Sequence, residues 1–340
     1  MMVVFYHYIN WYWKEDLAAQ IGSLLFNGAD AVSFFFVLSG FVLAYKFFKL
    51  GAHMHVGRFI FKRVFRLYPA YIVAVLISLG YWLSATTLDE TLTRVLHLNY
   101  GPVWAELSMI LQKHQFYVPG WTLGVEMRYS LLIPIFIFLV RWRSFALWIV
   151  LLISLFFHRY LNAQFLVHFT IGMCMVYHLD AIQKKNWGQS WIYKARYLIA
   201  LLCFIVFNLR HLDSIFHFPE TFQHVINQAG FGYFQLSGIA SAGIIFLLLI
   251  SKRWQKVLSY PVFIYLGKIS YGIYLMHWVF VLAVMEHYEF LINWFGMHEW
   301  ITFSLFLILV ISATILSADL MYRFIEAPII KWAKRKSRNW

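Results

Sequence analysis

The stretch WITFSLFLILVISATILSADLMY, residues 300–322, carries a single charged side chain, Asp319. A helix rises about 1.5 Å per residue, so roughly 20 apolar residues are needed to cross the hydrocarbon core of a bilayer. Residues 300–322 are therefore long enough to span a membrane as one helix. This stretch decides the fold class, because a soluble domain has no place for a helix that is apolar on every side.

Similar apolar stretches recur along the chain, which is 62% hydrophobic and only 13% charged. Soluble domains have a much larger charged share, about 25%. We therefore predict an all-α fold, a polytopic membrane helix bundle. Working outward from residues 300–322, the sequence predicts further spans at 28–48, 67–85, 121–140, 144–157, 163–179, 193–209, 230–250 and 262–285.

The first apolar segment, residues 1–13, is shorter than a span. At about 1.5 Å per residue it extends roughly 20 Å, against about 30 Å of hydrocarbon. We expect it to be the end of a truncated first helix, which brings the predicted number of transmembrane helices to about ten. A re-entrant segment is the alternative.

The basic residues follow the loops on one side of these spans. The predicted loops on that side hold 22 of the 28 Lys and Arg residues, whereas the opposite side holds 11 of the 15 acidic residues. This asymmetry accounts for the net charge of +13 without a nucleic-acid partner, and it predicts that both termini are cytoplasmic. We expect one membrane domain, residues 1–330, followed by a basic tail, residues 331–340, that contacts lipid headgroups.

Several polar residues lie inside the predicted spans, where ionisable groups are costly and tend to face a bundle interior. His7 lies in the middle of the first segment, and Glu126 shares a helical face with Tyr129 and Ser130. The structural alternatives are a hydrogen-bonded histidine for His7 and an ion pair with Arg128 for Glu126.

Two polar stripes occur on the last spans. Ser270, Tyr274 and His277 follow one another at i, i+4 and i+7, as side chains on one helix face do. These residues either line a cavity or form interhelical hydrogen bonds. The second stripe ends the last span, where Arg323 is placed to pair with Asp319 or Glu326, and we expect that cluster to be structural.

A basic helix face precedes the span at 67–85. Arg58, Lys62, Arg63 and Arg66 recur there at spacings of three to four residues. Guanidinium groups bind phosphates bidentately, so this face suits a phosphate-bearing cytosolic ligand. The alternative explanation is the general excess of Lys and Arg on the cytoplasmic side of a membrane protein.

Six short motifs occur along the chain: GADAVSFFFVLSGFVLAY (28–45), RFIFKRVFRLYPAY (58–71), GWTLGVEMRYSLLIP (120–134), FTIGM (169–173), LGKISYGIYLMHW (266–278) and FIEAP (324–328). In these motifs and in their order, the chain resembles the acyltransferase 3 family of integral-membrane acyltransferases. The resemblance covers nearly the whole chain. It implies a ten-helix bundle that transfers an acyl group, commonly acetyl, from cytosolic acyl-CoA to a hydroxyl of a glycan or similar acceptor.

The resemblance also assigns roles to individual residues. The family's first-helix histidine corresponds to His7, its Arg-x-x-Arg pair to Arg63 and Arg66, and its motif glutamate to Glu126. The family has an arginine about ten residues before that histidine, and this chain begins after that position. A second departure is EMRYS, where members often read E-E-Q-F-Y, so Arg128 replaces a neutral amide.

These assignments predict a mechanism. His7 acts as the base or the acyl acceptor, as histidine can near neutral pH, and Glu126 orients it. We expect Arg63 and Arg66, with Lys62, to bind the phosphates of acetyl-CoA or another acyl-CoA, and Tyr129, Ser270, Tyr274 and His277 to line the substrate cavity. No metal is expected, because His53 and His55 lack a partnering cluster.

The stand-alone architecture, without an esterase-like domain, implies an acceptor among surface or exported polysaccharides or lipid-linked sugars. A bacterial inner membrane is the location implied. A transporter of an acylated sugar or small acyl compound, and a non-catalytic partner in glycan assembly, are the alternatives. Acceptor identity, acyl chain length and oligomeric state are not determined by the sequence.

Overall fold

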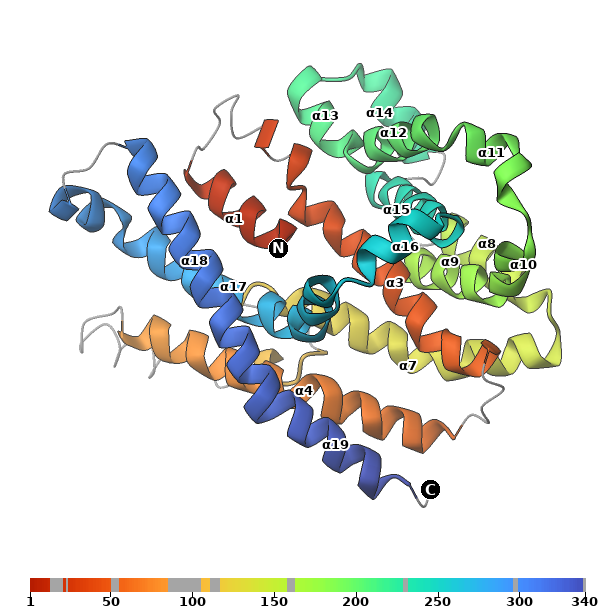
Figure 1. Cartoon of the computed structure of the whole chain (residues 1–340), viewed down its shortest axis with the longest axis horizontal. Helices are drawn as coiled ribbons and strands as arrows, with labels where there is room; N and C mark the ends of the chain where they lie inside the picture. The colour runs from red at the N-terminus through yellow and green to blue at the C-terminus, as the bar shows by residue number, and fades with distance from the viewer. Residues whose placement is uncertain are drawn as a thin grey trace. The chain divides into compact units, whose positions relative to one another are not determined.

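The described part of the chain is built mainly of helices (Figure 1). The computed structural model describes residues 1–12, 21–22, 24–49, 55–84, 105–110, 117–157, 163–228, 232–295 and 299–338, and these ranges contain helices and turns but no strand. The longer helices are α1 (Met2–Tyr12), α3 (Gly28–Lys49), α4 (Val56–Ser84), α7 (Gly120–Trp142), α8 (Ala146–Phe156), α9 (Leu166–Tyr177), α12 (Arg196–Phe207), α13 (Leu209–Phe216), α14 (Glu220–Gln228), α15 (Tyr233–Ile250), α17 (Pro261–Phe295), α18 (Glu299–Met321) and α19 (Ala327–Lys336). Shorter elements are α10 (Leu179–Lys184), η1 (Trp187–Gln189), α11 (Trp191–Lys194), α16 (Lys252–Leu258) and η2 (Tyr322–Glu326).

Six helices among the described residues are long and apolar enough to cross a membrane. They include α3, α4, α7, α15, α17 and the continuous helical stretch that contains α18. Each coincides with a predicted span, which confirms an all-α polytopic membrane protein. The helix α4 begins at Val56, before the predicted span, so the basic face from Arg58 to Arg66 belongs to the same helix as the apolar part.

The predicted number of ten spans is not confirmed. The segments predicted at 144–157 and 163–179 contain α8 and α9, which have 11 and 12 residues. At about 1.5 Å per residue each extends less than 20 Å, too short to cross the bilayer alone. The segment predicted at 193–209 is α12, which bends by 62° into α13 and makes a seventh span if the bent pair counts as one.

The chain forms two compact units, each built from segments distant in sequence. The first unit comprises residues 1–14, 55–127 and 262–340, and the second comprises residues 15–54 and 128–261. The boundary predicted between residues 330 and 331 falls inside α19, so the division into a membrane domain and a basic tail stays a prediction.

In the second unit, two glycines allow α3 and α9 to pack backbone against backbone. A Cβ atom added at Gly40 would lie 2.2 Å from the Phe169 carbonyl oxygen, and one added at Gly172 would lie 2.1 Å from that of Val37. Lipid supplies little hydrophobic drive between helices, so close contact at small residues is what holds such a pair together. The glycines of the SGF and FTIGM motifs therefore act in packing.

The start of α3 is fixed by its own cap and by the bend between α12 and α13. The Asn27 side chain accepts the Asp30 N–H at 2.9 Å and donates to the Asp30 carboxylate at 2.7 Å, a reciprocal helix cap. Asn27 also donates to Asn208 at 3.0 Å and contacts His211 at 3.1 Å. The predicted span that ends near Asn208 thus bends at a residue that is engaged in this polar network.

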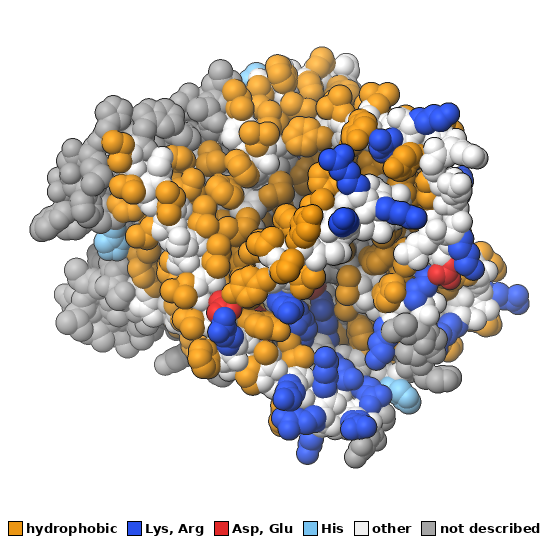
Figure 2. Space-filling view, in the orientation of Figure 1, with side chains coloured by type: hydrophobic (Ala, Val, Ile, Leu, Met, Phe, Trp, Pro, Cys, Tyr) orange, Lys and Arg blue, Asp and Glu red, His pale blue; other side chains and the backbone are white. Residues whose placement is uncertain are grey.

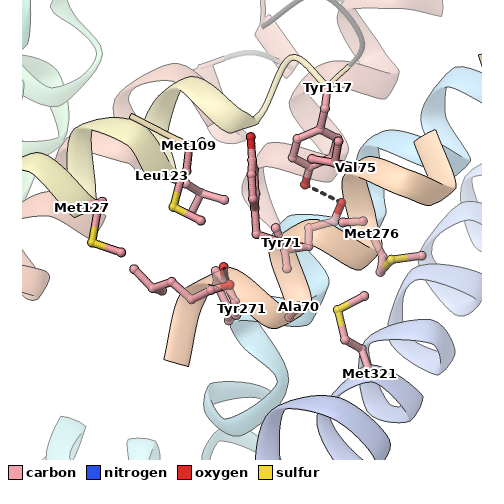
Figure 3. Packing of buried hydrophobic residues seen from close by; sticks show 13 residues of the cluster. Ala70, Tyr71, Val75, Met109, Tyr117, Leu123, Met127, Tyr271, Met276 and Met321 are labelled. Atoms are coloured by element: carbon pink, nitrogen blue, oxygen red, sulfur yellow. Dashed lines mark hydrogen bonds between the residues drawn. The ribbon is translucent and has the colours of Figure 1, made fainter. Parts of the chain in front are cut away.

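In the first unit, a buried cluster joins α4, α7 and α17 (Figure 3). Its larger members include Tyr71, Tyr117, Leu123, Met127 and Tyr271. Three of these are tyrosines, so their hydroxyls need partners inside the core. Tyr71 donates to the Glu106 carbonyl and Tyr271 to the Leu67 carbonyl. The core of this unit is therefore held by hydrogen bonds as well as by apolar packing.

The basic helix α19 packs on the start of α4. Arg58 donates to the carbonyls of Ser337 and Arg338 at 2.6 and 2.8 Å, and Trp332 contacts the rings of Phe61 and Phe65. Lys and Arg side chains gather over the end of this helix (Figure 2). The residues predicted as a basic tail, in solvent or against lipid headgroups, are thus helical up to Lys336, and Arg58 on α4 is hydrogen-bonded to the two residues that follow.

The α3–α9 contact gives a direct test of the packing. We expect Gly172→Ala to lower stability by at least about 2 kcal/mol, because the new methyl must push two backbones apart. Gly80→Ala is the control, since a Cβ at Gly80 would have nothing within 4 Å. The measurement is the unfolding temperature of each variant in detergent, and equal temperatures for the two variants would contradict the close contact.

Candidate active site

His7 on α1 lies against α17 in the first unit. Its imidazole stacks on that of His277, with ring centroids 5.6 Å apart, and meets Trp278 edge-on at 5.2 Å. Residues 7 and 277 are far apart in sequence, yet the fold places their rings side by side. Two of the predicted site residues are therefore neighbours.

A hydrogen bond made by one nitrogen of His277 determines which of its two nitrogens can accept a proton. Nδ1 lies 2.6 Å from the Tyr274 carbonyl oxygen. A carbonyl only accepts, so Nδ1 carries the proton, and in the neutral ring Nε2 carries the lone pair. His277 is fully buried, and its Nε2 has no hydrogen-bond partner among the described residues. A lone pair of this kind is what a proton acceptor needs.

One helical turn before His277, hydroxyl groups join α17 to the start of α7. The Tyr274 hydroxyl donates to the Pro119 carbonyl at 3.1 Å and is hydrogen-bonded to the Thr122 hydroxyl. Tyr117 donates to the Leu275 carbonyl at 2.7 Å (Figure 3). Burial raises the pKa of Tyr117 well above its ordinary value, with Tyr274 adding to the effect, so this phenol remains a donor.

Glu126 on α7 forms an ion pair with Arg63 on α4. The Arg63 and Glu126 side chains retain 10% and 5% of their exposure, so both charges are largely removed from solvent. The ion pair considered from the sequence was with Arg128, and the structure instead joins two residues of the family motifs. This contact fixes the start of α7 against the basic end of α4.

Tyr271 on α17 donates a hydrogen bond to the Leu67 carbonyl on α4. It is 9% exposed, and the charges of Glu126, Glu326, Arg63 and Arg66 all act on it. Arg66 is exposed and Lys62 is half-buried. Of the three residues predicted to bind phosphates, Arg66 is thus the most accessible, while Arg63 is engaged with Glu126.

Two of the residues predicted to line the substrate cavity, Ser270 and Tyr129, make other contacts. Ser270 is exposed and donates to the Gly267 carbonyl of its own helix at 2.9 Å. Tyr129 belongs to the second unit and packs on Phe169, with ring centroids 5.4 Å apart. Neither residue is brought to the imidazole pair within the first unit, and their role in a cavity stays a prediction.

Sequence reasoning missed three residues of this site: Thr122, Tyr117 and Trp278. Thr122 lies inside the motif GWTL, and Trp278 directly follows His277 in LMHW. Their position in these motifs could have predicted that they belong to the site. Tyr117 precedes α7 and looks like one of many aromatic residues in the chain. Only the fold shows that its hydroxyl reaches α17.

Comparison with known families identifies the chain. The family model described as "Acyltransferase domain" of the acyltransferase 3 family matches residues 1–322. The chain belongs to the acyltransferase 3 family. The resemblance drawn from the six motifs is confirmed, and the chain is an integral, multi-pass membrane acyltransferase.

Curated relatives carry related names at low identity. "Putative acetyltransferase ORF330" of Acidianus two-tailed virus is 26% identical over 291 residues, covering 82% of this chain and 78% of its own. "Putative O-acetyltransferase SACOL0978" of Staphylococcus aureus strain COL and "Putative O-acetyltransferase SAR0937" of strain MRSA252 are each 26% identical over 357 aligned positions. Those alignments cover 93% of this chain, which spans only 55% of the staphylococcal proteins. No solved structure matches the chain.

Metal ligation finds no support in the described part of the chain. Its His, Cys, Asp and Glu side chains form no group of three that could hold a metal ion. Cys174 and Cys203 are free thiols.

The ion pair between Arg63 and Glu126 gives a second test. Removing one member of a buried pair leaves the other charge uncompensated, at a cost of about 3–5 kcal/mol. We expect Arg63→Met and Glu126→Leu each to lower the unfolding temperature, and the double variant to lose less than the two singles combined. Unfolding in detergent measures this, and strictly additive losses would show that the pair is not coupled.

Proposed function

We propose that this protein transfers an acyl group, most simply acetyl, from acyl-CoA to a hydroxyl of a surface or exported polysaccharide or a lipid-linked sugar. The proposal combines family membership with one observation, the contact between the imidazoles of His7 and His277 beside the Thr122 and Tyr274 hydroxyls. Imidazole is the side chain best suited to accept a hydroxyl proton near neutral pH. The relatives named as acetyltransferases support acetyl as the group transferred.

The reaction forms one bond and breaks another. As the acceptor oxygen bonds to the acyl carbon, His7 takes the hydroxyl proton, and the carbon–sulfur bond of the thioester breaks. The thiolate leaves and is protonated to the free thiol, while the proton on His7 returns to solvent. In the covalent variant, the His7 nitrogen bonds to the acyl carbon as the carbon–sulfur bond breaks and the thiolate leaves. The acceptor oxygen then bonds to the acyl carbon, the carbon–nitrogen bond breaks, and the released imidazole nitrogen takes the hydroxyl proton.

His277 serves as the neighbour that positions His7. Its Nδ1 is committed to the Tyr274 carbonyl, which fixes the ring on α17. The face of this ring packs against the His7 imidazole and thereby limits the orientations that His7 can adopt. Because His277 is fully buried and His7 is half-buried, His7 is the imidazole that an acceptor can reach.

The donor approaches along α4 in this proposal. Arg66 and Lys62 bind the phosphates of acyl-CoA, since a guanidinium fork and an ammonium group both suit phosphate oxygens. Arg63 holds Glu126 in place at the inner end of this path, and Glu126 in turn orients the groups that meet the thioester. The cytoplasmic position of this basic face follows from the charge bias of the loops.

The acceptor arrives from the opposite face of the membrane. A bacterial inner membrane fits such a protein, with lipid as its surroundings and a glycan or lipid-linked sugar as its substrate. The acceptor and the membrane are proposed on other grounds than side-chain contacts. They rest on the family and on the asymmetry of charge.

The first test of this function replaces the proposed base. In cells expressing the protein, we expect His7→Ala to abolish the acyl mass increment on envelope glycan, with a loss of at least about 100-fold, since general base catalysis contributes about that much or more. Mass spectrometry of total envelope glycan measures the increment and identifies the group and its acceptor. His287→Ala is the matched control, because this exposed histidine on α17 lies outside the site.

Two results would contradict the proposal. An increment that persists in His7→Ala removes His7 from the chemistry. A wild-type protein that inserts normally yet adds no acyl group turns the assignment toward a transporter or a non-catalytic member of glycan assembly.

The phosphate contacts give a separate prediction. We expect Arg66→Gln to raise the KM for acetyl-CoA about 10-fold or more with little change in kcat, since a charge-assisted hydrogen bond is lost. With S-acetyl-pantetheine, which has no adenosine phosphates, the same variant should match the wild type. Lys256→Gln, which removes an exposed charge on α16, is the control. Equal effects on both donors would show that Arg66 does not bind phosphate.

A further inference from the structure

Glu326 is a buried carboxylate that the mechanism above does not use. It ends the π-helical turn η2, which interrupts the long helix between α18 and α19. Only 2% of the residue is exposed, and neither carboxylate oxygen has a hydrogen-bond partner among the described residues. A π-helical turn inside a helix is frequently found at functional sites.

The nearest candidate partner on the same helix is engaged elsewhere. Arg323 pairs with Asp319 at 2.7 Å, and Asp319 also accepts a hydrogen bond from Tyr265 at 2.7 Å. The sequence allowed Arg323 to pair with either acidic residue, and the structure selects Asp319. The turn η2 contacts α4, and the charge of Arg66 on α4 acts on Glu326.

A second polar group beside the same helices is also left without a partner. Arg63 uses its Nη2 group for Glu126, but its Nε–H is buried and has no acceptor among the described residues. Arg63 lies on α4, and η2, which carries Glu326, contacts α4. The site therefore offers one unused donor and one unused acceptor.

Such groups are costly when they stay unpaired. A buried donor or acceptor without a partner destabilises the fold by about 1–3 kcal/mol, and more when it is charged. A ligand that supplies both an N–H and a C=O would satisfy the two groups together. The secondary amide has this combination, and it occurs in the pantetheine arm of coenzyme A.

We propose that Glu326 and the Nε–H of Arg63 bind the amide groups of the pantetheine arm of the acyl-CoA donor. The inference rests on the proposed function and adds a binding site to it. Glu326 accepts the amide N–H, and Arg63 donates to the amide carbonyl. Glu326 is thus a residue that recognises coenzyme A by its arm, separately from the residues that bind its phosphates.

The position of the site along α17 agrees with this assignment. Tyr271, which marks the amide site, precedes His277 by six residues, a rise of about 9 Å. Tyr271 also donates to the carbonyl of Leu67, the residue that follows Arg66 at the end of the basic face of α4. The arm of coenzyme A has the same order, with the thioester at one end, the amides along its length and the phosphates at the other end.

The test compares two ligands that differ by the arm. Purified protein in detergent is titrated with coenzyme A and with the bisphosphate 3′-phospho-ADP (adenosine 3′-phosphate 5′-diphosphate), which has the adenine and all the phosphates of coenzyme A but no pantetheine. We expect Glu326→Leu to weaken binding of coenzyme A about 10-fold to 100-fold and to leave binding of the bisphosphate unchanged, because a hydrogen bond to a charged group is lost. Glu326→Gln, which keeps one acceptor oxygen, should fall between Glu326→Leu and the wild type.

Asp319→Asn is the matched control. This carboxylate lies on the same helix but is already bonded to Tyr265 and Arg323, so its loss should leave both affinities unchanged. Folding is checked by the unfolding temperature, which Glu326→Leu should not lower, because it replaces an unpartnered buried carboxylate by an apolar side chain.

Each outcome decides between the claims. If the wild type binds coenzyme A and Glu326→Leu binds it equally well, the amide site is wrong and the proposed function stands. If Glu326→Leu weakens both ligands alike, the residue does not recognise the arm. If the folded wild type binds neither ligand, the donor assignment itself fails and the amide site fails with it.

Discussion

The buried ion pair between Arg63 and Glu126 is the interaction on which the arrangement of the first unit depends. Lipid offers apolar helices no reason to prefer one neighbour, so polar contacts and close backbone packing decide which helices meet. This pair joins the basic end of α4 to the start of α7, and the hydroxyls of Thr122 and Tyr274 join that start to α17. If one residue of the pair were replaced by an apolar residue, the charge of the other would be buried without its partner. These contacts hold the basic face of α4, the start of α7 and the polar residues of α17 together in the first unit.

The two units are stabilised by different means. In the second unit, Gly40 and Gly172 bring α3 and α9 into backbone contact, and the hydrogen bonds around Asn27 fix the start of α3. In the first unit, tyrosine hydroxyls and an ion pair occupy the core. Apart from Tyr129, every residue predicted for the site lies in the first unit.

The sequence predicted the long spans because apolar length alone determines them. It could not show that α8 and α9 are short or that the helix bends after Phe207, since these ends depend on packing and on the partners of Asn208. His7 and Glu126 stood out as costly polar residues, but their partners are distant in sequence and follow from helix adjacency. Helical spacing placed Ser270 with Tyr274 and His277, yet the start of that stripe is exposed. The π-helical turn that ends at Glu326 has no signal in the sequence pattern.

The central claim is that this membrane bundle breaks the thioester of acyl-CoA and transfers the acyl group to a glycan hydroxyl. The most direct measurement is the release of free coenzyme A thiol from acetyl-CoA by the purified protein, with and without envelope glycan. The account predicts thiol release that requires the glycan and equals, mole for mole, the acetyl group gained by it. Folded protein that binds the donor but releases no thiol with glycan present would contradict the account.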